Sequence, residues 1–271
     1  MMDMNKMISE IKSFAKGVDD ILSPVEVIEW FENIAKENNK IKEEIYNKDE
    51  TGRDIKCYVI GKGETILLYA FPDPGEAVGG TSIKVLTQLL LDEQSSISKM
   101  PYRFVIVPCL NFLDQPNNGV KNERLQKTRA QEVDWCLSDP RLETRAIIKI
   151  AKKYEPKLTF PLHDEWHSKE YVDPYLGVDP VISKKLATEI TEIFAGYDME
   201  MNSEYDDPEM GKGFFNMKSI GPEYKNCTFS LFAKMGHVFV CEVPYGKNLK
   251  AASLVEIQLS VFISFINGVF N

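Results

Sequence analysis

Two carboxylates three positions apart stand where an apolar stretch of the chain ends. Residues 67–71 (LLYAF) predict a buried strand, and a proline-stiffened loop carrying Asp73 and Glu76 follows it, just before a predicted helix. His163 follows a second apolar stretch. If the two strands are neighbours, all three side chains lie at one edge of a sheet, where ligands and catalytic groups collect in open α/β proteins. A histidine with two carboxylates can hold zinc or a harder divalent cation and leave positions open for water.

A fourth residue, Glu242, is a candidate for the base of such a site. It lies in the late apolar run 238–243, where a buried carboxylate must be paired, protonated or linked to a metal. A bound metal acidifies water and polarises a carbonyl, and a nearby carboxylate can take the proton of that water.

Each of these residues also has a simpler interpretation. Asp73 and Glu76 fit a turn followed by helix-start carboxylates that the helix dipole stabilises. His163 fits a hydrogen-bonded structural residue, and Glu242 fits an exposed position at a sheet edge. The spacing alone leaves both interpretations open.

The elements that must position these residues alternate along the chain. Strands are expected at 65–70, 104–110, 157–160 and 238–243, and helices at 81–92, 180–195 and 249–268. A further helix is expected to begin at Asp139-Pro140 and to run to about residue 154. The alternation predicts an α/β fold with one mixed, twisted, mostly parallel sheet flanked by helices.

The first part of the chain differs from this alternation. Residues 1–40 read as an N-terminal helical extension, in which Ser23-Pro24 predicts a helix start, and residues 41–271 read as one α/β domain. Within that domain, residues 41–46 and 55–60 predict a hairpin or a meander at a sheet edge. A polar loop of about 25 residues, 111–135, is longer than most loops inside a domain, and such loops are often functional.

Composition restricts the function classes. The 271 residues carry a formal net charge of −9, which disfavours a nucleic-acid or anionic-membrane binder, because both need a basic face. The five cysteines include no C-x-x-C pair, so buried reduced thiols are expected, as in a reducing cytoplasm. No secretory signal is evident, and the apolar segments read as too short or too interrupted to span a bilayer. These observations predict a soluble cytoplasmic protein.

Several short segments resemble the zinc carboxypeptidases, especially their bacterial carboxypeptidase-like branch, and more distantly the succinylglutamate desuccinylase and aspartoacylase group. The resemblance covers residues 65–245, in which the order of the blocks is kept. The matching blocks are 71–79 (FPDPGEAVG), 131–135 (QEVDW), 143–148 (ETRAII), 161–163 (PLH) and 241–245 (CEVPY).

The resemblance implies a role for each residue. Glu76 and His163 would be metal ligands, and Glu242 would activate water and pass its proton to the leaving amine. Asp73 occupies the position of the family's first histidine ligand. Aspartate can bind zinc, but it lowers the positive charge of the site and favours harder metals. The alternative is that the aspartate marks a site in which metal affinity and catalysis are reduced or lost.

The resemblance also implies groups that bind the substrate. The family's adjacent Asn-Arg pair is missing from this sequence, and the nearest arginines are Arg124 and Arg129 in the long polar loop. A guanidinium there would suit a substrate carboxylate; exposed loop arginines are also often only solvated. Tyr224 precedes the last strand, as a substrate-contacting tyrosine does in some relatives.

Together these features predict a metal-dependent hydrolase, with one divalent cation and zinc as the expected metal. It would cleave an amide bond in a peptide or an acylated amino acid. The first alternative is a non-catalytic member of the fold that binds a peptide or amino-acid ligand, and the second is a deacylase of N-acyl amino acids. The sequence gives no oligomeric state.

Overall fold

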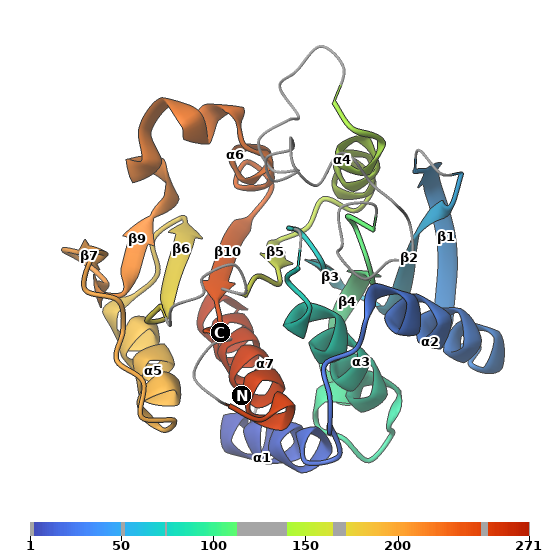
Figure 1. The fold of residues 1–271 in the computed structure, drawn as a ribbon, viewed down its shortest axis with the longest axis horizontal. Helices are drawn as coiled ribbons and strands as arrows, with labels where there is room; N and C mark the ends of the chain where they lie inside the picture. The colour runs from blue at the N-terminus through green and yellow to red at the C-terminus, as the bar shows by residue number, and fades with distance from the viewer. Residues whose placement is uncertain are drawn as a thin grey trace.

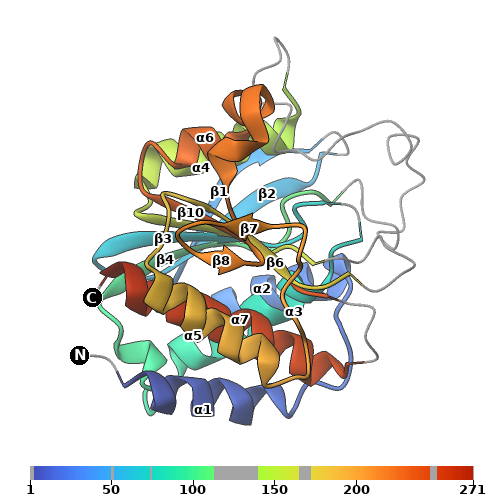
Figure 2. The same cartoon turned by 90° about the vertical axis from the view of Figure 1, so that its left-hand side faces the viewer.

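Eight strands form one mixed sheet with helices on both of its faces (Figures 1 and 2). The structure is a computed structural model, and it describes residues 3–49, 52–73, 75–112, 140–164, 172–244 and 249–270. Helices α4 and α6 cover one face of the sheet, and α2, α3, α5 and α7 cover the other, with α1 packed on the outer side of α3 and α7 (Figure 2). The predicted mixed α/β sheet is therefore confirmed. The helices are α1 (Met4–Ala15), α2 (Pro24–Glu37), α3 (Val78–Leu91), α4 (Leu142–Tyr154), α5 (Lys184–Ala195), α6 (Thr228–Phe232) and α7 (Ala251–Phe270).

The strand order decides which chain segments become neighbours. The order is β1-β2-β4-β3-β5-β10-β6-β9. The four central strands, β4, β3, β5 and β10, run parallel. The pairs β1–β2, β2–β4 and β10–β6 are antiparallel, and β9 pairs in parallel with β6. The strands are β1 (Ile41–Lys48), β2 (Asp54–Gly61), β3 (Glu64–Tyr69), β4 (Tyr102–Val107), β5 (Leu158–Pro161), β6 (Tyr175–Asp179) and β10 (His237–Glu242), with the shorter β7 (Asp206–Asp207), β8 (Gly211–Lys212) and β9 (Phe214–Asn216).

Local signals placed several elements correctly. Ser23 caps α2 in a capping box with Glu26, and Pro24 occupies the first helical position. The hairpin β1–β2 forms at the edge of the sheet, as the turn between the two segments predicted.

Three predicted helix starts were wrong. Helix α5 begins at Lys184, four residues later than expected, with Ser183 as its N-cap. Helix α3 begins at Val78, three residues earlier than expected. The first turn was not predicted because Gly79 and Gly80 are poor helix formers. Helix α4 begins at Leu142 with Arg141 in the N-cap position, so Pro140 precedes the helix. Arg145 Nε donates to the carbonyl oxygen of Pro140 at 2.8 Å and ties that segment to the first turn.

Strand β6 was not predicted at all. It has only five residues, and Gly177 in its middle interrupts any strand-like pattern. The glycine is required by packing, because a Cβ atom there would lie 2.6 Å from the ring of Phe215.

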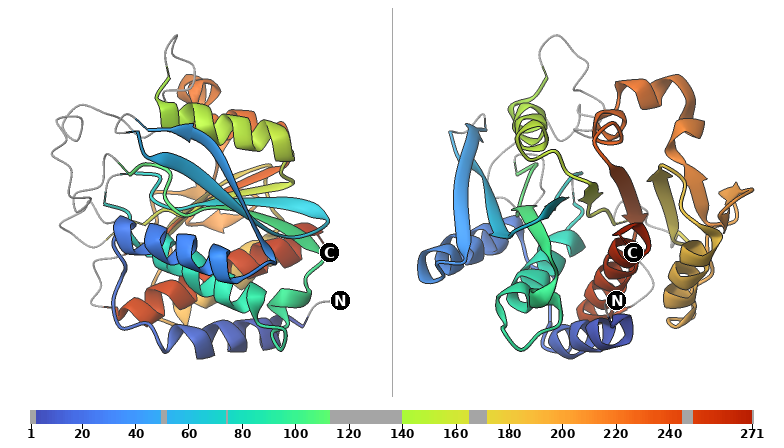
Figure 3. Two further views of the ribbon diagram at one scale, coloured as in Figure 1. Left: turned by 90° about the vertical axis from the view of Figure 1, so that its right-hand side faces the viewer. Right: turned by 180° about the vertical axis from the view of Figure 1, so that it is seen from behind.

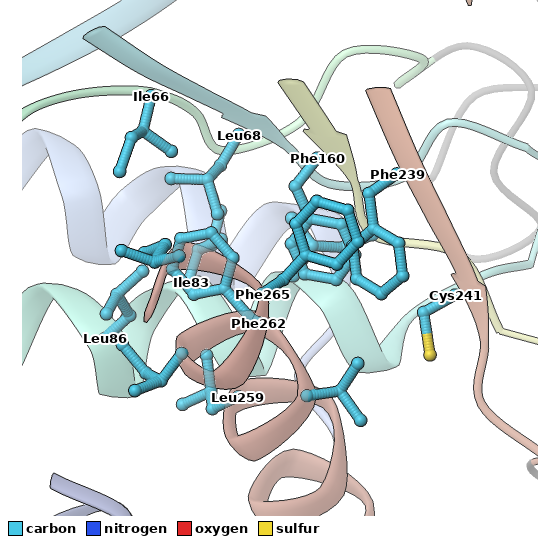
Figure 4. Close-up of a cluster of buried hydrophobic side chains, with 14 of the residues drawn as sticks. Ile66, Leu68, Ile83, Leu86, Phe160, Phe239, Cys241, Leu259, Phe262 and Phe265 are labelled. Carbon is cyan, nitrogen blue, oxygen red and sulfur yellow. The ribbon is translucent and has the colours of Figure 1, made fainter. Parts of the chain in front are cut away.

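Stacked phenylalanines fix the central strands against α7. Phe160 on β5 stacks on Phe239 of β10 at 4.9 Å between ring centroids, and Phe239 stacks on Phe265 of α7 at 4.0 Å. Phe262 of α7 stacks on Phe160 at 5.2 Å, and Figure 4 shows these rings interleaved beneath the sheet. All four side chains are buried, so the relative position of β5 and β10 is set by close packing.

Helix α7 corrects the expectation that no apolar segment is long enough for a bilayer. Its 20 residues have the length and composition of a membrane-spanning helix, as no other helix in the described ranges does. However, 67% of its most apolar window is buried inside the protein. Helix α7 packs against α1, α3 and α5 (Figure 3), and this central position accounts for its apolar composition.

The N-terminal helices join the same core. Met7, Ile11 and Ala15 of α1 are buried and belong to one hydrophobic cluster with the inner residues of α3 and α7. Helix α2 contributes Phe31, whose ring lies 5.1 Å from that of Tyr58 on β2.

Candidate metal centre

The candidate residues follow three strands that lie side by side. Asp73 and Glu76 follow β3, His163 follows β5, and Glu242 ends β10. Strand β5 pairs in parallel with both β3 and β10, so the carboxyl ends of all three strands meet at one edge of the sheet. Beyond β5, Asp164 forms an isolated parallel bridge with Val243, one residue after His163 and Glu242 respectively. The structure therefore brings these side chains together.

His163 lies at the centre of the group. Its Nδ1 atom is 3.0 Å from Oε2 of Glu76, 3.7 Å from Oδ2 of Asp73 and 3.6 Å from Oε1 of Glu242. One ligand atom from each of Asp73, Glu76 and His163 lies within 4.8 Å of the others. Donor atoms that share one divalent cation lie about 2.0–2.2 Å from it, so spacings of this size suit a common ion.

The charges of the group favour a cation. Three carboxylates surround one imidazole, and the side chains of Glu76 and His163 are only 4% and 6% exposed. Burial raises the pKa of Glu76 well above its usual range; the charges of Asp73 and Glu242 raise it further, while His163 opposes the shift. A bound divalent cation would compensate this buried negative charge, so the donor set fits a metal.

The loop that carries Asp73 and Glu76 has an unusual backbone. Phe71, the second residue after β3, has a positive φ of 53°, which is uncommon for a bulky residue. Its buried ring lies against Gly80 of α3, where a Cβ atom would come within 2.5 Å of it. The sharp exit from β3 and the glycine-rich start of α3 together set where Asp73 and Glu76 lie.

Sequence reasoning missed Gln258 on α7. Its Nε2 atom donates a hydrogen bond of 2.9 Å to the carbonyl oxygen of His163, and the side chain is fully buried. The available signal was a long amide in a mostly apolar helix, since a buried polar side chain needs a partner.

Tyr224 lies elsewhere. Its hydroxyl donates to Oδ2 of Asp179, which also pairs with Lys218 at 2.9 Å. Burial and the hydrogen bond to Asp179 raise the pKa of Tyr224. Asp179 pairs with Val238 at the beginning of β10, so it lies roughly 13 Å along the strand from Glu242. The structure therefore does not bring Tyr224 to the metal-ligand group, which consists of Asp73, Glu76 and His163.

The other predicted residues fall into two groups. Arg124 and Arg129, with most of the long polar loop, lie outside the described residues. The side chain of Cys241 points into the core, on the face of the sheet opposite to the side chain of Glu242 (Figure 4). Burial and then the charge of Glu242 raise the pKa of the Cys241 thiol well above its usual range, with His163 opposing. The four described cysteines are buried thiols outside any disulfide, as predicted.

Comparisons with known proteins give a likeness of structure. No protein-family model matches the chain, and no curated protein matches its sequence.

Among solved structures, a metallo-carboxypeptidase from Burkholderia cenocepacia is 12% identical, with a TM-score of 0.63 over 90% of this chain and 69% of that one. A carboxypeptidase A from Helicoverpa armigera is 12% identical, with a TM-score of 0.64 over 98% of this chain and 78% of that one. A metallo-carboxypeptidase from Pseudomonas aeruginosa, solved in complex with (2-guanidinoethylmercapto)succinic acid, is 13% identical, with a TM-score of 0.61 over 90% and 68%. The chain therefore has the fold of the metallocarboxypeptidases.

Proposed function

We propose that this protein is a metal-dependent hydrolase that cleaves an amide bond in a peptide or an acylated amino acid. The observation that carries the proposal is the convergence of Asp73, Glu76 and His163 within 4.8 Å, with Glu242 beside them, at the strand ends of a metallocarboxypeptidase fold. Asp73, Glu76 and His163 would hold one divalent cation, and zinc is the first candidate. Such a cation, when bound, polarises an amide carbonyl and acidifies water.

Glu242 and an arginine of the long loop would supply the other groups that the reaction needs. Glu242 accepts a proton from the attacking water at Oε1 and transfers it to the nitrogen of the leaving amine. Its side chain is 12% exposed, so a substrate can reach it. Its partial burial strengthens the electrostatic interaction between the carboxylate and that substrate. An arginine of the long loop, Arg124 or Arg129, would orient an anionic substrate through a bidentate contact.

Asp73 supports the main alternative, a protein that binds a peptide or amino-acid ligand without cleaving it. An aspartate in place of a histidine adds a third carboxylate around His163 and weakens the Lewis acidity of a bound cation. A deacylase of N-acyl amino acids would keep the metal and change only the substrate. Assays of C-terminal peptide cleavage and of N-acyl amino acid hydrolysis, run side by side, separate these substrates.

Metal content is the first test. Elemental analysis of protein purified without a metal-affinity tag should give close to one divalent metal per chain for the native protein and a large loss for Asp73→Ala. Asp19→Ala, which removes an exposed carboxylate near the end of α1, is the matched control and should keep the metal. No metal in the native protein, even after addition of zinc, manganese or cobalt, would exclude the hydrolase and leave a binding protein.

A further inference from the structure

The N-terminus of α3 has no cap of its own. Ala77 is in the N-cap position with a helical backbone and no side-chain hydrogen bond. The backbone N–H of Val78 donates instead to Oδ2 of Asp164, at 2.9 Å, from a residue 86 positions later in the sequence. Asp164 is fully buried. Because Glu76 immediately precedes Ala77, this bond fixes the segment that carries a candidate ligand.

Asp164 touches the two chain segments that carry the candidate metal ligands and the third segment, which carries Glu242. It follows His163 directly, it forms the parallel bridge to Val243 beside Glu242, and its carboxylate holds the first turn of α3. Its position therefore couples segments that are far apart in the sequence.

The first turn of α3 also packs tightly on the end of β5. A Cβ atom on Gly79 would lie 2.7 Å from Cβ of Leu162 and 2.8 Å from its carbonyl oxygen. The backbone N–H of Leu162 donates to the carbonyl oxygen of Tyr69 at 3.0 Å, so this segment is also held to β3. The contact leaves little room for α3 to shift without moving the residue next to His163.

We infer that Asp164 is a positioning residue for the candidate metal centre. Its carboxylate holds the Glu76 segment and the His163 segment at the separation that a shared cation needs. The inference rests on the proposed metal-binding function, and it adds a residue that contacts neither the cation nor the substrate. Groups that orient metal ligands in this way typically change metal affinity about 10- to 100-fold when removed.

Metal affinity in matched variants tests the inference. Competition with a chelating dye for Zn²⁺ should show a loss of about tenfold or more for Asp164→Ala, and a smaller loss for Asp164→Asn, which keeps an acceptor oxygen. Ser183→Ala is the control, because Ser183 caps α5 by accepting from the Leu186 N–H at 3.2 Å, and α5 carries no candidate ligand. It should lower the midpoint of thermal unfolding and leave Zn²⁺ affinity unchanged. An equal loss of affinity in Ser183→Ala would overturn the inference.

Amide hydrogen exchange in metal-free protein tests the coupling without any metal. Asp164→Ala should speed exchange at both Val78 and Leu162, whereas Ser183→Ala should change neither. If Asp164→Ala does not fold, Asp164→Asn decides, because a neutral acceptor holds the N–H less strongly than a carboxylate. Unchanged exchange at both amides would overturn the inference. A native protein that binds no metal, with exchange that responds as expected, would instead overturn the proposed function alone.

Discussion

Oε2 of Glu76 lies 3.0 Å from Nδ1 of His163, although the two residues are 87 positions apart in the sequence. Glu76 follows β3 and His163 follows β5, and these two strands are direct neighbours in the sheet. Both side chains are buried, and Asp73 and Glu242 add two further carboxylates within 3.7 Å of the imidazole. This arrangement leads to three predictions, and a separate carboxylate on β1 leads to a fourth.

Replacing Asp73 by histidine should shift the metal preference of the site. Imidazole suits zinc, whereas carboxylates suit harder cations such as manganese. Asp73→His should therefore raise affinity for Zn²⁺ relative to Mn²⁺ by about tenfold, or ~1.4 kcal/mol. Competition titrations with both metals measure the ratio. Asp73→Asn, which removes the charge and keeps the size, should weaken both metals, and an unchanged ratio in Asp73→His would mean that residue 73 is not a ligand.

Replacing Glu242 by glutamine should separate catalysis from metal binding. General-base catalysis typically contributes about 10²- to 10⁴-fold, so turnover should fall by that order once a substrate is known. Metal content should stay at the native level, because Glu242 is not one of the three clustered donors. Elemental analysis and turnover on the same preparation measure both effects. Loss of metal in Glu242→Gln would make Glu242 a metal ligand. If the native protein shows no turnover and Glu242→Gln binds a peptide or amino acid as the native protein does, the non-catalytic alternative is favoured.

The raised pKa of Glu76 predicts opposite pH responses with and without metal. In metal-free protein its folded pKa is above the unfolded value, so its contribution to stability is present at acid pH and is lost as the pH rises through the folded pKa. A metal must displace this proton, so metal affinity should fall as the pH falls.

Unfolding in chelator across pH 5–8 and Zn²⁺ titrations over the same range check this prediction. In chelator, Glu76→Gln should be more stable than the native protein at neutral pH, because no charge is buried there. Equal stability of the two metal-free proteins at neutral pH would contradict it.

A carboxylate far from the candidate metal centre should control acid stability. Glu44 on β1 accepts hydrogen bonds from Lys153 at 2.6 Å, from Tyr154 at 2.8 Å and from Tyr46 at 2.8 Å, which links β1 to α4. Burial alone would raise the pKa of Glu44, but these bonds and that of Lys42 lower it to about 2. A lowered pKa adds stability above the unfolded value, and that stability is lost as the pH falls from about 4.3 towards 2.

Glu44→Gln should therefore flatten the decline in the free energy of unfolding over this acid range, measured by urea unfolding at several pH values. Glu37→Gln, which changes an exposed carboxylate on α2, is the control and should keep the native decline. A decline in Glu44→Gln as steep as in the native protein would assign the acid sensitivity to other groups.

Local signals in the sequence determined most of the elements. The helical spacing after Ser23-Pro24 and the apolar runs that became β3, β5 and β10 depend on nearest-neighbour propensities, which act within a few residues. The same runs marked where Asp73, Glu76, His163 and Glu242 stand, because each of these polar residues ends or follows an apolar strand. Elements without such signals, such as β6 with its central glycine, could not be found in this way.

Tertiary packing decided which of these residues meet. The order β3-β5-β10 joins segments that are not consecutive in the chain. The stacking of Phe160, Phe239 and Phe265, which sets β5 against β10, is a contact that no local pattern encodes. The hydrogen bond to Asp179 holds Tyr224 near the beginning of β10, away from Glu242. The sequence could not identify Asp164 as the cap of α3, because its hydrogen-bond partner Val78 lies 86 residues away in the chain. The sequence determined which groups could do chemistry, and only the register of the folded sheet decided their distances, since that register depends on contacts summed over the whole core.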